Sequence, residues 1–142
     1  MAVHGRVELE RVGRVIRDRA RASLMSDTKW RKLISALSAP ELQLKQCVVK
    51  FIDARDEKVL HLPLLLSAPR PWLDTFEFGP VPLRSIAWML FPRIVKYERG
   101  NGHVPKGEFL QNVDAAAVAV NALGKYPIAL SEQGLLITGH VV

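Results

Sequence analysis

The chain has 142 residues, of which 49% are hydrophobic and 24% are charged, which is close to ordinary globular composition. This composition excludes a wholly disordered chain, and no apolar run approaches the roughly 20 residues that a membrane-spanning helix needs. The length predicts one domain. The single cysteine, Cys47, excludes an intramolecular disulfide and a cysteine-based zinc site. Because the N-terminus lacks the apolar segment of a secretory signal, we expect a cytoplasmic protein.

The net charge of +6 is concentrated near the N-terminus. Residues 1–32 hold nine Lys or Arg and four Asp or Glu, a net charge of +5. The other 110 residues hold eleven basic and ten acidic side chains, a net charge of +1. A basic protein is a candidate for binding nucleic acid or an anionic membrane. Here that inference rests on the N-terminal segment alone.

Residues 1–24 form a basic extension whose apolar residues recur at a loosely helical spacing, although Gly13 weakens a helix by about 1 kcal/mol. Three interpretations are open. The sequence Met25-Ser26-Asp27-Thr28 is typical of a natural start, which makes residues 1–24 upstream sequence. Otherwise they are a solvated or disordered arm, or an arm that binds phosphates or anionic lipid.

Residues 25–142 are predicted to form a single α+β domain. Its first element is a helix through Leu37, with Asp27 or Thr28 as its N-cap. The apolar residues of this helix recur at i, i+3, i+4 and i+7 and form one face: Trp30, Leu33, Ile34 and Leu37. Ala39-Pro40 ends the helix. Residues 44–53 predict a strand, and the side chains of one face are those of Cys47, Val49 and Phe51.

The next elements are strands separated by breaks. A charged turn and a second strand at 58–66 complete a hairpin, and proline-rich residues 67–71 break regular structure. Alternation around Phe76 and Phe78 predicts a short strand. Residues 79–82 predict a turn or extended loop, because two prolines fix φ and remove donors.

Further along the chain, residues 85–91 have the composition of a buried strand that Pro92 stops. Residues 94–98 extend this strand past a bulge, and residues 99–107 form a loop.

The C-terminal part predicts a helix at 115–123, capped by Asn112 or Asp114 and ended by Gly124. A hairpin of residues 127–130 and 135–142 follows it. The element order predicts an α+β fold: a mainly antiparallel sheet packed by two helices, preceded by the basic N-terminal extension.

Three segments of the sequence resemble segments of a known protein family. They are Thr28-Lys29-Trp30, the run Gly-Pro-Val-Pro-Leu-Arg-Ser-Ile-Ala-Trp at 79–88, and residues 123–140. They are similar to a family of small uncharacterised bacterial proteins, a domain of unknown function that starts near Thr-Lys-Trp. The resemblance covers residues 26–141 and implies a small cytoplasmic protein that starts at Met25. It brings no catalytic residues, and Ala87 stands where the family pattern has an acid. Some members are expected to be immunity-like partners of toxins.

Catalytic and metal-binding patterns are absent from the sequence. The four histidines form neither His-x-x-x-His nor His-Glu-x-x-His, so no metal site is predicted, and nothing predicts a cofactor. His103, Glu108 and Asp114 make a site only if the fold brings them together. Cys47 lies on an apolar strand face, which predicts a buried thiol rather than a nucleophile. His61 is predicted to be a hydrogen-bonded strand residue.

Residues 70–99 interleave basic and aromatic side chains, as do protein hot spots and single-strand binding surfaces. Arg84 is the strongest candidate for a binding residue, followed by Trp72, Arg70 and Trp88. The competing interpretation places Trp88 and the phenylalanines in the core, with the arginines at its edge.

Three functions are left open. The first is a non-catalytic interaction module, immunity-like, that binds a protein partner and no membrane. The second is a nucleic-acid-binding protein that uses its basic residues near the N-terminus: Arg14, Arg17, Arg21, Lys29, Arg31 and Lys32. The third is an enzyme whose site is assembled from scattered polar residues. The sequence does not predict an oligomeric state.

Overall fold

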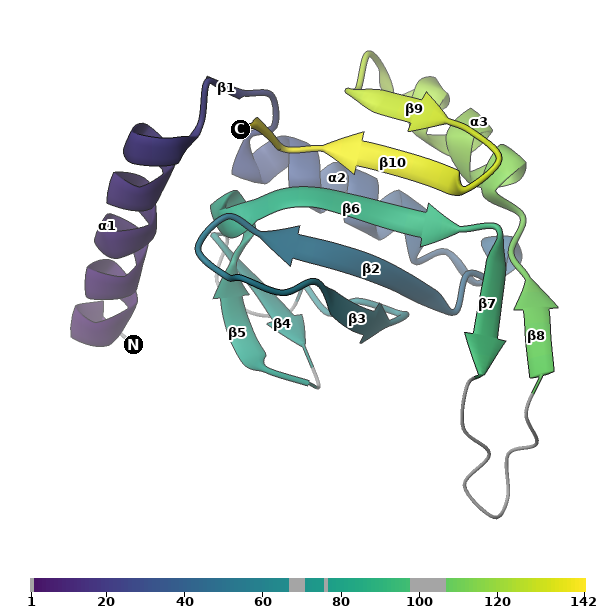
Figure 1. The fold of residues 1–142 in the computed structure, drawn as a ribbon, viewed down its shortest axis with the longest axis horizontal. Coiled ribbons are helices and arrows are strands. Elements are labelled where there is room, and N and C mark those ends of the chain that lie inside the picture. Colours follow the sequence, from purple (N-terminus) through teal and green to yellow (C-terminus); the bar gives the residue numbers. More distant parts are fainter. Residues whose placement is uncertain (1, 67–70, 76, 98–106) are drawn as a thin grey trace.

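The computed structural model describes residues 2–66, 71–75, 77–97 and 107–142, and it combines helices with antiparallel strands (Figure 1). The elements follow in this order: α1 (Ala2–Arg19), β1 (Ala22–Ser23), α2 (Asp27–Leu37), the 3₁₀ turn η1 (Pro40–Leu42), β2 (Gln46–Phe51), β3 (Lys58–His61), β4 (Trp72–Thr75), β5 (Gly79–Pro82), the 3₁₀ turn η2 (Leu83–Ser85), β6 (Ile86–Pro92), β7 (Ile94–Tyr97), β8 (Gly107–Leu110), α3 (Val113–Leu123), β9 (Ile128–Leu130), β10 (Gly134–Thr138) and β11 (His140–Val141).

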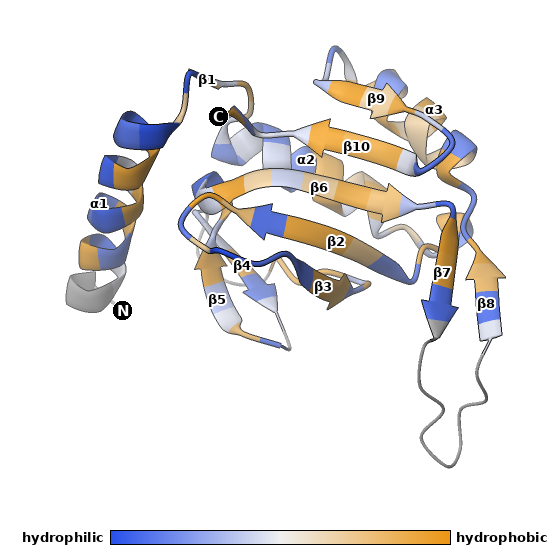
Figure 2. Cartoon of the chain, viewed as in Figure 1, coloured by the Kyte–Doolittle hydropathy of each residue, from blue (hydrophilic) through white to orange (hydrophobic). Residues whose placement is uncertain are grey.

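The centre of the fold is a five-stranded antiparallel sheet in the order β3-β2-β6-β10-β9. Figure 1 shows α2 and α3 together behind this sheet, and Figure 2 shows that its middle strands are largely apolar. Helices gathered on one face of an antiparallel sheet confirm the predicted α+β class. Among the described residues, no helix is both long enough and apolar enough to cross a membrane.

The core lies between α2, α3 and the sheet. The predicted apolar face of α2 is buried, and so are the predicted inward residues of β2 (Trp30, Leu33, Ile34 and Leu37 from the helix; Cys47, Val49 and Phe51 from the strand). The N-cap of α2 is Ser26 rather than Asp27 or Thr28. Ser26 has the extended backbone that a cap needs, and its Oγ accepts a 3.1 Å hydrogen bond from the Lys29 N–H. Asn112 caps α3 as predicted.

The strands between β3 and β6 differ from the prediction. The strand expected around Phe76 lies earlier, at β4, and Phe76 itself is outside the described residues, as are residues 67–70. The expected turn at 79–82 is strand β5, which pairs only with β4. Pro80 and Pro82 are accommodated because β5 lies at the edge of this sheet, where a strand can do without some of its N–H donors.

Two further differences concern strand breaks. Residues 94–97 do not continue β6 but form β7, which pairs antiparallel with β8; this pair was not predicted. Most of the loop expected at 99–107 lies outside the described residues. The predicted last strand is divided at Gly139 into β10, which pairs with β6, and β11, which pairs with β1. The Gly139 N–H donates to the Ala87 carbonyl of β6 (2.7 Å).

The N-terminal segment is not a solvated or disordered arm in the structure. Helix α1 packs on β5 and η2, with Val12 fully buried. Arg11 pairs with Asp53 (2.6 Å), and Arg19 donates to the Ile52 carbonyl (2.9 Å). Strand β1 pairs with β11 at the opposite end of the chain. A third helix therefore adds to the two that were predicted.

Replacing Gly139 by alanine is expected to destabilise the fold by about 1 to 3 kcal/mol, because the added Cβ has no room. That atom would lie 2.3 Å from the Ile86 carbonyl oxygen and 2.9 Å from Cζ2 of Trp30. Gly107→Ala is the matched control, since nothing lies within 4 Å of its added Cβ. Urea unfolding measures both free energies. Equal losses in the two variants would contradict this packing.

Candidate functional site

The described residues hold no group of three or more His, Cys, Asp or Glu side chains placed to bind a metal ion. The hypothetical catalytic residues His103, Glu108 and Asp114 are also not seen to form a site among the described residues. His103 lies outside the described residues, and Glu108 is exposed on β8. Asp114 pairs with Arg93 (2.9 Å), and this hydrogen bond lowers the pKa of the Asp114 carboxyl. The Asp114 carboxylate is therefore paired with the Arg93 guanidinium, which does not suit an acid–base catalyst.

Cys47 is buried, and two histidines lie within hydrogen-bond distance of polar groups. Cys47 is fully buried, and burial raises the pKa of its thiol to about 12. His61 Nδ1 lies 3.0 Å from Oε1 of Glu77. His140 is buried, with Nδ1 2.9 Å from Ser23 Oγ and Nε2 2.6 Å from the Arg84 carbonyl oxygen. The burial of Cys47 matches its predicted role as a buried thiol, and the contact with Glu77 matches the predicted role of His61 as a hydrogen-bonded strand residue.

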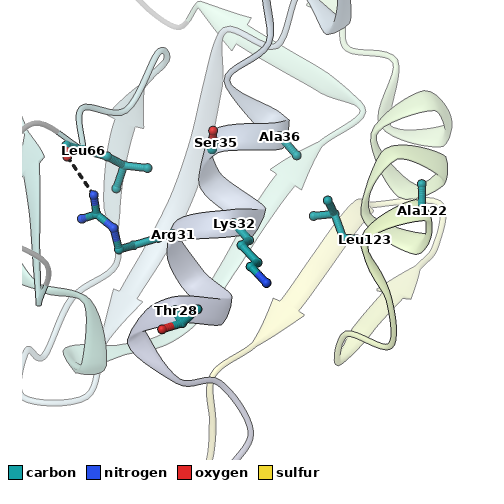
Figure 3. A pocket seen from close by; sticks show the side chains of 8 residues that line it. All are labelled: Thr28, Arg31, Lys32, Ser35, Ala36, Leu66, Ala122 and Leu123. Atoms are coloured by element: carbon teal, nitrogen blue, oxygen red, sulfur yellow. Dashed lines mark hydrogen bonds between the residues drawn. The ribbon is translucent and has the colours of Figure 1, made fainter.

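The largest hollow lies along the outward side of α2 and has a volume of about 890 Å³. We call it the α2–α3 groove. It is lined by Thr28, Arg31, Lys32, Ser35, Ala36, Leu66, Ala122 and Leu123 (Figure 3). The α2 residues recur at i, i+3, i+4, i+7 and i+8, so they form the face opposite the buried one. Figure 3 shows Leu66 on one side of α2 and Leu123 on the other.

The α2–α3 groove combines positive charge with apolar side chains. Arg31 donates a 3.1 Å hydrogen bond to the Leu66 carbonyl, which fixes one wall, while Lys32 is exposed. Next to the lining residue Thr28, Nζ of Lys29 lies 3.4 Å from the Lys125 carbonyl oxygen and over the Tyr126 ring. None of the described residues that line the groove is acidic. The groove is thus a basic surface with apolar walls.

A second hollow, of about 480 Å³, lies between α1 and η2. We call it the arginine hollow. Its lining residues are Arg6, Leu9, Glu10, Gly13, Arg14, Arg17 and Arg84. Arg84 comes from the body of the domain and is held by Asp27 (Nη2–Oδ2 2.9 Å). The other three arginines are exposed on α1. The guanidinium groups of Arg11 and Arg19, which fasten α1 to the body, are not among the lining residues.

The four candidate binding residues lie in different parts of the structure. Arg84 lies at the surface and lines the arginine hollow, but Trp72 is only 6% exposed and so belongs to the core rather than to a binding surface. Trp72 is buried because the Pro71 carbonyl accepts from the Leu83 N–H (2.8 Å), which holds the start of β4 against η2. Trp88 is half-buried and lines a separate hollow with Arg19 and Lys50. Arg70 lies outside the described residues.

The six nucleic-acid candidates do not form one surface. Arg14 and Arg17 line the arginine hollow. Arg31 and Lys32 line the α2–α3 groove, with Lys29 near its end. Arg21 is exposed beside β1.

Sequence reasoning missed residues in both hollows. Arg6 could have been found, because positions 6, 10, 13 and 17 share one side of a helix. Leu66 and Leu123 come from distant segments, and no local spacing marks them as neighbours of α2.

Comparisons of the chain with protein-family models, with curated proteins and with solved structures found no match.

The buried thiol gives a direct test of the core. At pH 8 Cys47 is expected to stay protonated and unreactive toward a disulfide reagent such as dithiobis(nitrobenzoate), because its pKa is raised to about 12 and no reagent reaches it. Absorbance measures the released thiolate. The protein unfolded in urea should react at once, and Cys47→Ala gives the background. Equally fast reaction of the folded protein would contradict the burial.

Proposed function

We propose that this protein is a non-catalytic interaction module that binds an acidic amphipathic helix of a partner protein in the α2–α3 groove. The observation that carries the proposal is the combination of cations and apolar side chains along the outward face of α2. An immunity-like role, a bacterial source and a cytoplasmic location stay predictions.

The charge of the groove supports an acidic partner. Arg31 and Lys32 line it, and Lys29 follows the lining residue Thr28 in the first turn of α2. Asp27, at the start of α2, is already paired with Arg84 and offsets little of this charge. The positive end of the α2 dipole adds to the same potential. Carboxylates on a partner would meet complementary charge here, which favours both encounter and orientation.

The shape of the groove supports a helical partner. Ser35 and Ala36 are small, so the second half of α2 allows another helix to approach at the usual 8 to 10 Å between axes. Leu66 is half-buried and Leu123 is 42% exposed, and they offer apolar contacts on either side. A helix bound in a groove places apolar anchors at i, i+3, i+4 and i+7, with its charged residues at the rim. Leucine anchors flanked by glutamates fit these walls.

The test uses two synthetic helical peptides with the same leucine face, one carrying glutamates and the other lysines. Fluorescence anisotropy measures binding of each labelled peptide to the full chain. We expect the glutamate peptide to bind and the lysine peptide to bind at least tenfold more weakly, because the groove is basic. Failure of the glutamate peptide to bind, or equal binding of both, would overturn the proposal.

Two pairs of variants locate the binding. Lys32→Glu is expected to weaken the glutamate peptide about threefold to tenfold, whereas Lys45→Glu, which makes the same charge change at an exposed site before β2, should not. Leu123→Ser should cost about tenfold through lost apolar contact, and Leu110→Ser, at a 77% exposed site on β8, should cost nothing. Equal effects within either pair would show that binding lies elsewhere.

A further inference from the structure

We propose a second binding site: the arginine hollow binds the phosphate backbone of a nucleic acid without reading its sequence. The site uses Arg6, Arg14 and Arg17 of α1 together with Arg84 of η2. It shares no lining residue with the α2–α3 groove. The inference therefore stands or falls independently of the proposed function.

The chemistry of the lining fits phosphate. Guanidinium groups form paired hydrogen bonds to phosphate oxygens, and arginine is the usual residue for this task. The acids at the site are Glu10, which lines the hollow, and Asp27, which holds Arg84. The four arginines with these two carboxylates leave a net charge of +2. Gly13 also lines the hollow, and a Cβ added there would lie 3.6 Å from Nη1 of Arg17, so this guanidinium lies beside the helix backbone.

The spread of the arginines favours a polymer over a single phosphate. Arg6 and Arg17 are eleven residues apart on one helix, which corresponds to roughly 16 Å along its axis. Guanidinium groups that bind one phosphate would converge on one point instead. A row of this length matches successive phosphates of a nucleic acid strand.

The attachment of α1 makes this row a fixed surface rather than a loose arm. The apolar side of α1 is used by the body, where Val12 is fully buried. The Arg11–Asp53 pair holds the helix itself to the body, and the β1–β11 pairing holds the chain just after its C-terminal end. Asp27 orients Arg84 before any ligand arrives. Val12 is buried against the body and Val7 is 57% exposed, and one exposed valine offers too little apolar surface to insert into a lipid surface. This favours nucleic acid over a membrane.

The test measures anisotropy of a labelled, mixed-sequence DNA duplex with the full chain at several salt concentrations. Four phosphate contacts predict a slope of about −3.6 for log K against log salt, or about 100-fold weaker binding at 200 mM than at 50 mM. Arg14→Ala with Arg17→Ala should make the slope shallower by about 1.8. A second duplex of different sequence should bind equally well.

Lys45→Ala with Lys96→Ala is the matched control, because it removes the same charge from exposed sites on other elements. Circular dichroism confirms that both double variants are folded. The proposal is overturned if the duplex does not bind at 50 mM salt, if both double variants change the slope equally, or if anionic phosphatidylglycerol vesicles bind while DNA does not. The α1 variant should bind the glutamate peptide as the parent does, which separates this site from the α2–α3 groove.

Discussion

The close approach of the Trp30 indole to the backbone at Gly139 is the constraint on which the rest of the arrangement depends. A side chain at 139 would collide with Trp30 and with the Ile86 carbonyl, so α2 lies close to the sheet only because this residue is glycine. The same glycine donates its N–H to Ala87 on β6 and accepts from the Leu24 N–H with its carbonyl. One residue thus connects α2, the central sheet and the segment between β1 and α2.

The residues next to this junction position both candidate surfaces. His140 follows Gly139, and its ring contacts Ser23 on β1 and the Arg84 carbonyl in η2. The Arg84 side chain then reaches Asp27 at the start of α2. Arg84 lines the arginine hollow, and Thr28, which follows Asp27, lines the α2–α3 groove. The two surfaces share this frame while keeping separate linings, which is the arrangement that the two proposed anionic ligands would need.

Apolar spacing within one helix or strand correctly predicted which face of that element is buried. The i, i+3, i+4, i+7 stripe from Trp30 and the alternation around Cys47 each identified a buried face. What failed depended on contacts between distant segments. Pro80 and Pro82 indicated a loop, yet β4 provides a partner that tolerates them. The basic residues near the N-terminus suggested one surface, but the fold divides them between α1 and α2, and it adds Arg84 to the first set and Leu123 to the second. Trp72 was a candidate binding residue and is buried.

The most direct test of two separate binding surfaces is a map of backbone amide NMR shifts in the ¹⁵N-labelled chain. It is recorded first with the glutamate peptide, then with the DNA duplex, and then with both. The account predicts that the peptide shifts amides of α2 and the end of α3, that the duplex shifts amides of α1 and η2, and that each pattern persists when the other ligand is present. Competition between the ligands, or one shared set of shifted amides, would contradict it.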